Sequence, residues 1–313
     1  MNRWAVTLAV LLCSVAVSAD DPSPRPRIFG IAQVTVLTTH PRAAQEFYSK
    51  VLRIMQPTHC AHCDHVMANP RYSVNHHQLV GVQSTLDAPR NLIESITFAT
   101  DDLGALRRYL EFHKIAARVP DQPQSSPATE LLTVSDPEGH KISFVQWTQG
   151  MPTLTHETLD RREIIHAGFV VKDRAAEDAF YKDVLGFHVY WHGGMKDGTD
   201  DWVDMQVPDG TDWLEYMLNV PANADHHTLG VMDHMAIGVA DIHTANDELV
   251  AAGVKFSEKP QIGRDGKWQL NLYDPDGTRV EFMERKPTQQ PCCSRYLGPH
   301  LGEQVNPQAP SAQ

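Results

Sequence analysis

The chain has 313 residues, of which 42% are hydrophobic and 21% are charged, so it is long enough for two domains with ordinary cores. Its formal net charge is −12 and its Lys and Arg residues form no run, which argues against nucleic acid and anionic membrane surfaces as partners. The 17 His residues permit metal chemistry.

The first nineteen residues have the features of a signal peptide. Arg3 precedes an apolar stretch, residues 4–17, that is too short to span a membrane comfortably, and Val17-Ser18-Ala19 matches a signal-peptidase site. We therefore predict that residues 1–19 are removed and that the protein is secreted or periplasmic, with no membrane attachment afterwards. An uncleaved anchor is the alternative. Residues 20–27 are a Pro-rich linker.

The mature chain keeps four cysteines, and an oxidising compartment favours disulfides between them. Cys60 and Cys63 form a CxxC motif flanked by His residues, so a redox or metal role is an alternative to a structural disulfide. Cys292 and Cys293 are adjacent near the C-terminus. The sequence does not determine which cysteines pair.

The rest of the chain repeats one pattern: a strand, a helix, and two or three further strands. Each half has a predicted helix that contains a Phe-Tyr pair, Phe47-Tyr48 in a helix from about Pro41 to Leu52 and Phe180-Tyr181 in the second half. Each half also has a tight turn before its last strand, Asp136-Pro137-Glu138-Gly139 and Asp274-Pro275-Asp276-Gly277. The four units span about residues 28–88, 92–149, 163–222 and 231–286.

These repeats resemble the vicinal oxygen chelate superfamily, which includes glyoxalase I, extradiol dioxygenases and resistance proteins. The resemblance implies an α+β fold in which four βαβββ modules pair two and two into domains with open, cup-shaped sheets. The first domain would be residues 28–149 and the second residues 162–286. Residues 287–313 are a Pro-rich tail with little helix or strand signal.

Four residues of the second half occupy equivalent strand positions: His166, Glu215, His234 and Glu281. A single such His is usually structural and a single such Glu is usually solvated, but two imidazoles and two carboxylates together suit a divalent metal. Their pattern is similar to that of glyoxalase I. The resemblance implies that these four residues bind one ion of Zn, Ni, Co, Mn or Fe(II).

The first half lacks this set of ligands. Its matching positions are Gln33, Ser95 and Ser143, and there is no Asp or Glu between Val66 and Leu86. We therefore predict that the first domain binds no metal at this place and serves packing, dimerisation or access. The sequence does not determine whether the protein forms a homodimer.

The resemblance implies a lyase or isomerase that acts on a small oxygen-rich substrate through a metal-stabilised enediolate or oxyanion. Glu281 or Glu215 would be the general base, with Glu281 preferred. Arg264, Lys267 and Gln269 precede the last strands and are candidates to bind an anionic substrate, although a solvated hairpin is the alternative. Trp202 is a candidate pocket residue, with core packing as the alternative.

Two other function classes remain. In an extradiol dioxygenase, His166, His234 and Glu281 would hold iron or manganese, but the family's Tyr position is Asn271 and residues 264–266 contain no His. The two-domain layout with a metal-free first half favours this class. The third class is a non-catalytic protein that binds a small molecule and confers resistance.

Overall fold

The structure is a computed structural model that describes residues 24–51, 69–119, 131–147, 162–300 and 303. The predicted signal peptide and the CxxC motif at Cys60 and Cys63 lie outside these residues. Among the helices of the described residues, none is both long enough and apolar enough to cross a membrane.

The first half forms a six-stranded mixed sheet with the strand order β2-β3-β1-β4-β6-β5. At its centre β1 pairs in parallel with β3 and antiparallel with β4, and β4 pairs in parallel with β6. The elements are β1 (Ile28–Thr38), α1 (Pro41–Glu46), the π-helical turn η1 (Phe47–Val51), β2 (Arg71–Ser73), β3 (Leu79–Ser84), β4 (Ile93–Thr100), α2 (Leu103–Phe112), β5 (Leu131–Ser135) and β6 (Lys141–Gln146).

The second half forms an eight-stranded sheet with the strand order β12-β13-β14-β11-β7-β10-β9-β8. Here β7 and β11 are antiparallel at the centre, β10 is parallel to β7, and β14 is parallel to β11. The elements are β7 (Glu163–Val170), α4 (Arg174–Asp178), the π-helical turn η2 (Ala179–Val184), β8 (His188–Gly193), β9 (Trp202–Gln206), β10 (Trp213–Met217), α5 (His226–Met232), β11 (His234–Val239), α6 (Ile242–Ala251), β12 (Gln261–Ile262), β13 (Trp268–Tyr273) and β14 (Arg279–Glu284).

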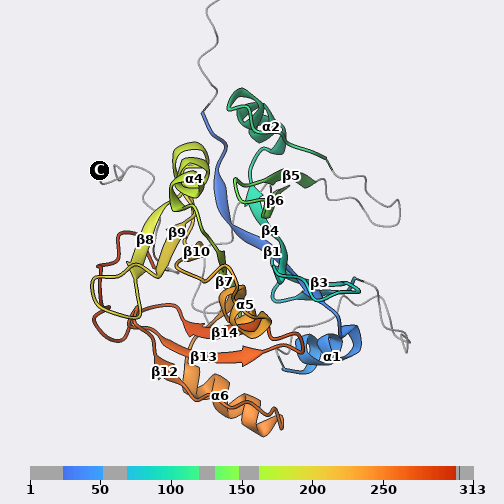
Figure 1. Ribbon diagram of the computed structural model, residues 1–313, viewed down its shortest axis with the longest axis vertical. Coiled ribbons are helices and arrows are strands. Elements are labelled where there is room, and N and C mark those ends of the chain that lie inside the picture. Colours follow the sequence, from blue (N-terminus) through green and yellow to red (C-terminus); the bar gives the residue numbers. More distant parts are fainter. Residues whose placement is uncertain (1–23, 52–68, 120–130, 148–161, 301–302, 304–313) are drawn as a thin grey trace, which may run out of the picture.

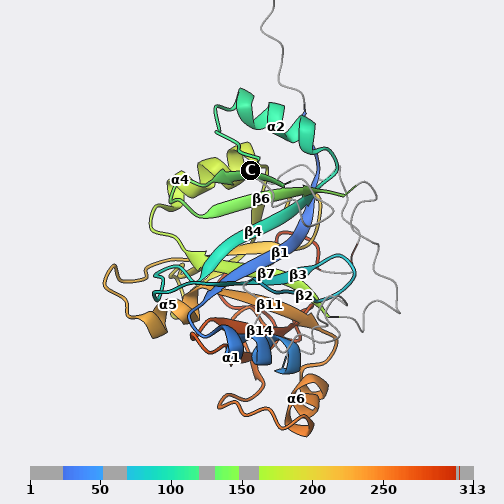
Figure 2. The same ribbon diagram turned by 90° about the vertical axis from the view of Figure 1, so that its right-hand side faces the viewer.

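The same local chemistry starts the helices of both halves. Asp102, Asp173 and Asp241 each stand just before a helix, and each carboxylate accepts a hydrogen bond from the backbone N–H three residues later. Such caps satisfy a backbone donor that the first turn of a helix leaves unpaired. The predicted α+β fold of curled, paired sheets is confirmed. Figure 2 shows β1, β4 and β6 of the first sheet as neighbours.

Two carboxylates of the second half, Asp209 and Asp212, bind the first strand and the residues just before it. Asp209 accepts hydrogen bonds from the backbone N–H of Ile28 at 2.8 Å and from Arg25 at 3.0 Å. Asp212 is 2% exposed and accepts from the N–H of Ile31 at 2.7 Å. Arg25, in the predicted linker, therefore contacts the second half directly.

The described part of the tail, residues 287–300, contains no helix or strand, as its composition indicates. It nevertheless packs along the second sheet through hydrogen bonds. The N–H of Leu297 donates to the carbonyl of Tyr190 at 2.9 Å, and the hydroxyl of Tyr296 donates to the carbonyl of Asp265 at 2.7 Å. These contacts hold the tail against β8 and against Asp265.

Candidate metal centre and its pocket

The four predicted ligands lie in two cross-strand rows on one face of the second sheet. In one row Ala236 is opposite both His166 and Glu281, and in the other Gly168 is opposite both Glu215 and His234. Opposite residues of neighbouring strands point to the same face. The small residue at the centre of each row leaves room for the two larger side chains to approach one another.

The site depends on the absence of a side chain at Gly168. A Cβ atom there would lie 2.1 Å from Cε1 of His234, well inside contact distance. The imidazole of His234 therefore occupies the space above the backbone of β7.

The ligand atoms converge at distances that suit one ion. The two Nε2 atoms of His166 and His234 are 3.1 Å apart, and Oε2 of Glu215 is 2.7 Å from Nε2 of His234. Oε2 of Glu281 lies 3.5 Å from Nε2 of His166. Two ligands at right angles on an ion, each about 2.1 Å from it, are about 3 Å apart. The residues present therefore fit a divalent metal.

Hydrogen bonding and burial prepare the imidazoles for this role. Nδ1 of His234 donates to the carbonyl of Met232 at 2.8 Å, so Nε2 faces the site. Without an ion, Nε2 carries a proton and donates to Glu215; an ion would take the place of that proton. His166 is 1% exposed, and burial lowers its pKa although Glu281 and Glu215 oppose the shift. A neutral imidazole is the form that binds metals.

The two carboxylates, Glu215 and Glu281, remain charged because nearby positive groups outweigh the effect of burial on their pKa values. Burial by itself would raise the pKa of Glu215, but the hydrogen bond and charge of His234 lower it to about 2. Burial likewise acts against Glu281, whose pKa is nevertheless lowered by its hydrogen bond to His166 and by the charge of Arg279. Charged carboxylates are the form that binds a divalent ion.

A cavity of about 350 Å³ opens above these ligands. Arg264, Gln269 and Trp202, three of the predicted substrate-binding residues, line it. The complete lining is His166, Trp191, Met195, Trp202, Asp204, Trp213, Glu215, Gln261, Ile262, Gly263, Arg264, Asp265, Gln269, Arg279, Glu281 and Met283.

Lys267 does not have the expected position. Its side chain is fully buried outside the cavity lining, and its Nζ atom lies 4.2 Å from the ring centroid of Trp213 and 4.9 Å from that of Tyr190. Nζ is 3.7 Å from Oδ2 of Asp265. Lys267 therefore does not line the cavity that Arg264, Gln269 and Trp202 line. Aromatic rings and one carboxylate stabilise this buried charge instead.

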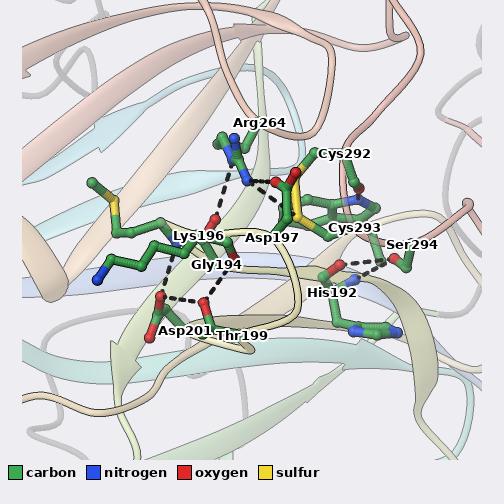
Figure 3. Close-up of a disulfide and its surroundings, with 12 residues drawn as sticks. His192, Gly194, Lys196, Asp197, Thr199, Asp201, Arg264, Cys292, Cys293 and Ser294 are labelled. Atoms are coloured by element: carbon green, nitrogen blue, oxygen red, sulfur yellow. Dashed lines mark hydrogen bonds and ion pairs between the residues drawn. A yellow bond between two sulfur atoms is a disulfide. The ribbon is translucent and has the colours of Figure 1, made fainter.

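Figure 3 shows how Arg264 is held at the rim of the cavity. Its Nε donates to the carbonyl of Gly194 at 3.1 Å, and its Nη2 donates to Asp197 and lies 3.6 Å from Sγ of Cys293. Cys293 forms a disulfide with its neighbour Cys292. The tail cysteines thus pair with each other, which leaves neither of them to pair with Cys60 or Cys63.

The sequence did not indicate two polar residues of the cavity. Asp204 is 3% exposed and lies opposite Glu215 in the sheet; burial and the charge of Glu215 raise its pKa well above the usual value. Nε of Arg279 is buried and forms no hydrogen bond to any described residue. A period-two reading of the strands could have marked both, since Asp204 alternates with apolar neighbours and Arg279 is two residues before Glu281.

A comparison with models of protein families gives a match in the second half of the chain. Residues 163–282 match the family model described as the Glyoxalase/Bleomycin resistance protein/Dioxygenase superfamily. They belong to this superfamily. The resemblance inferred from the repeated units is thereby confirmed.

Two curated relatives of this superfamily are lactoylglutathione lyases. The chain is 26% identical over 148 residues to a probable chloroplastic enzyme of Arabidopsis thaliana, which covers 46% of the chain and 42% of that protein. It is 27% identical over 128 residues to the enzyme of Haemophilus influenzae, which covers 40% of the chain and 95% of that protein. The chain thus spans less than half of the plant relative and nearly all of the bacterial one.

Solved structures of the superfamily share the fold over both halves. Homoprotocatechuate 2,3-dioxygenase from Arthrobacter globiformis superimposes with a TM-score of 0.62 at 17% identity, covering 90% of this chain and 85% of its own. The Mn(II)-bound glyoxalase from Novosphingobium aromaticivorans superimposes with a TM-score of 0.59 at 17% identity, covering 83% of each chain. At such identities the likeness concerns the fold alone.

Proposed function

We propose that the second half is a divalent-metal lyase or isomerase of the glyoxalase type, acting on a small anionic α-hydroxycarbonyl compound. The observation that carries this proposal is the position of Glu215, whose Oε2 is 2.7 Å from Nε2 of His234. Glu215 adds a second carboxylate to the set formed by His166, His234 and Glu281. These four residues would hold the ion, and its remaining coordination positions would be open to substrate oxygens.

A divalent ion bound by these residues would polarise the substrate oxygens and stabilise the negative charge that develops on them. The chain itself supplies the proton transfer. Glu281 accepts the proton from one substrate carbon at Oε2 and returns it to the neighbouring carbon, so the net reaction is an isomerisation. His166, Glu215 and His234 offer ligand atoms within 4.8 Å of one another, and Glu281 stands outside this tighter group.

Two arginines support an anionic substrate. Arg264 and Arg279 both line the cavity, so two guanidinium groups place positive charge beside it, which suits a carboxylate. Arg264 is already oriented by Gly194 and Asp197. We assign to these side chains the binding and orientation of the substrate's anionic group. Trp202, which also lines the cavity, covers the apolar part.

Metal content and activity together test this function. The protein is purified without oxygen, and its metal ions per chain are measured together with the isomerisation of small α-hydroxycarbonyl compounds, including hemithioacetals of glutathione and of other thiols. The Glu215→Gln variant should weaken ion binding and lower the turnover, whereas the control Glu94→Gln, in the first sheet beside Lys141, should change neither. If the protein takes up no divalent ion at the cavity under any loading condition, the proposed function is wrong.

Ring cleavage by an extradiol dioxygenase is the second candidate. Its support is the two-sheet layout shared with homoprotocatechuate 2,3-dioxygenase. The chemistry of the cavity opposes it, because among the lining residues His166 is the only His and no Tyr is present, so the expected acid–base partners are missing. Tightly bound Fe(II) that is unaffected by Glu215→Gln, together with catechol cleavage, would favour this candidate instead.

Export is a further part of the proposal. It rests on the signal-peptide features of residues 1–19. An exported enzyme would meet a thiol or hydroxycarbonyl compound other than cytosolic glutathione adducts. N-terminal sequencing of the protein from its native compartment tests export. The molecular mass measured by solution scattering tests whether the protein forms a homodimer.

A further inference from the structure

The two halves contact each other through the same pair of elements twice. The hydroxyl of Tyr181, in the second half, donates to Oδ2 of Asp136 in the first at 3.0 Å. The hydroxyl of Tyr48, in the first half, donates to Oδ2 of Asp274 in the second at 2.9 Å. Each contact joins the Phe-Tyr helix of one half to the Asp-Pro turn of the other.

These two contacts differ in their ionisable groups. Beside Tyr181 and Asp136 lie Glu177, on α4, and His140, which follows the turn. The repeat places Ala44 and Thr278 at the corresponding positions of the other contact. Because the fold forms one contact without these two groups, packing alone does not require them. Burying a carboxylate costs free energy unless it is paired, so the additional carboxylate of Glu177 needs another explanation.

At the contact between Tyr181 and Asp136, the ionisable side chains form a compact cluster between the halves. Nδ1 of His140 is 2.7 Å from Oδ2 of Asp136, and one ligand atom from each of Asp136, His140 and Glu177 lies within 4.8 Å of the others. Glu177 is fully buried. Its Oε1 accepts from the N–H of Glu138 at 3.0 Å, and its Oε2 is buried with no hydrogen bond to any described residue.

The cluster has too little positive charge for its carboxylates. Burial and the charge of Asp136 raise the pKa of Glu177 to about 8. The carboxylate of Glu138, on the same turn as Asp136, adds further negative charge beside Glu177. Within the cluster only His140 can carry a positive charge. A cation among these three ligand atoms would satisfy Oε2 of Glu177 and balance both carboxylates.

We propose that Asp136, His140 and Glu177 bind a second divalent transition-metal ion, which joins the two halves of the chain. Two carboxylates and one imidazole suit Zn²⁺ or Mn²⁺, whereas Ca²⁺ prefers oxygen ligands throughout. Two ionised carboxylates neutralise the ion, and the His140 ring binds through the Nδ1 lone pair with its proton on Nε2. The side chain of His140 is 15% exposed, which gives the ion a path from solvent.

Elemental analysis of the full chain distinguishes this site from the cavity site. Protein stripped with a chelator and reloaded with Zn²⁺ should bind two ions per chain, Glu177→Gln one, His234→Ala one, and the double variant none. Glutamine has the shape of a protonated glutamate, so Glu177→Gln should fold whether or not an ion binds there. The matched control Glu258→Gln, a carboxylate bonded to Asn271 and Tyr273, should keep both ions.

A stability measurement gives an independent readout. Zn²⁺ should raise the thermal unfolding midpoint of His234→Ala but not that of the double variant, because only the former keeps a complete ion site. If wild type binds one ion that His234→Ala removes and Glu177→Gln does not, the carboxylates share a proton and the interface site is overturned. One ion that Glu177→Gln removes and His234→Ala does not would support the interface site and contradict the proposed function.

Discussion

The hydroxyl of Tyr48 donates a hydrogen bond of 2.9 Å to Oδ2 of Asp274, a residue 226 positions later in the chain. Figure 1 shows the cause: α1 of the first half lies at the end of β13, beside the turn that carries Asp274. Tyr181 and Asp136 form the reciprocal bond. Each half therefore stabilises a turn of the other, and the turn at Asp274 leads directly into the strand that bears Glu281.

Removing the Tyr48 hydroxyl should destabilise the protein. Tyr48→Phe leaves the buried Oδ2 of Asp274 without its donor, which should lower the free energy of unfolding by about 1–3 kcal/mol. Urea denaturation measures the change. Tyr72→Phe is the control, because Tyr72 stacks on Tyr48 at 5.9 Å but its buried hydroxyl bonds to no described residue. Equal losses for both variants would contradict a specific role for the Tyr48 bond.

Asp274 should make stability depend on pH. Burial raises its pKa from 3.8 to about 6, despite the hydrogen bond from Tyr48. The native state then binds more protons than the unfolded state between about pH 4 and 6, so this group's contribution to stability decreases as pH rises through that interval. The loss is about 3 kcal/mol at most, since one pKa unit corresponds to about 1.4 kcal/mol.

Asp274→Asn tests this pH dependence, because the amide keeps an oxygen for the N–H groups of Asp276 and Thr278 and carries no titrating proton. As pH rises from 4 to 6, the free energy of unfolding of the variant should increase relative to that of wild type. Urea denaturation at several pH values gives both curves. Parallel curves would mean that Asp274 does not titrate in this interval.

Gly168→Ala should damage the metal centre more than the fold. The new Cβ would lie 2.1 Å from Cε1 of His234, so the imidazole must move away from the other ligands. We expect a loss of metal affinity of about tenfold to a hundredfold, the range seen when ligand orientation is disturbed. Competition with a chromogenic chelator measures it. Gly104→Ala, on helix α2 with no contact below 3.5 Å, should leave affinity unchanged.

Arg279→Gln should weaken the binding of anionic ligands at the cavity. The guanidinium of Arg279 lines the cavity and would pair with the anion, and a hydrogen bond to a charged group is worth about 1.5–3 kcal/mol, or roughly tenfold to a hundredfold in affinity. Calorimetric titration of the metal-loaded protein with oxalate measures this. Arg107→Gln, which removes a surface pair with Glu111, is the control. Unchanged oxalate affinity in Arg279→Gln would show that the anion binds elsewhere.

The sequence by itself determined the α+β class, the fourfold repeat and the four convergent residues of the second half. These are local properties: side chains alternate across a strand with a period of two, and turns such as Asp274-Pro275-Asp276-Gly277 mark where strands begin. Once the repeat aligned the strands, His166 and Glu281 fell on one face without knowledge of any long-range contact.

Only the tertiary structure decided the surroundings of that face. The burial of Lys267 under Trp213, the pairing of Cys292 with Cys293, and the packing of the tail on β8 all depend on contacts between segments far apart in the chain. The hairpin that contains Lys267 reads as polar and exposed, because its covering aromatic rings come from other strands and from the tail. Local patterns carry no information about which distant segment covers a residue, so these features follow from three-dimensional packing alone.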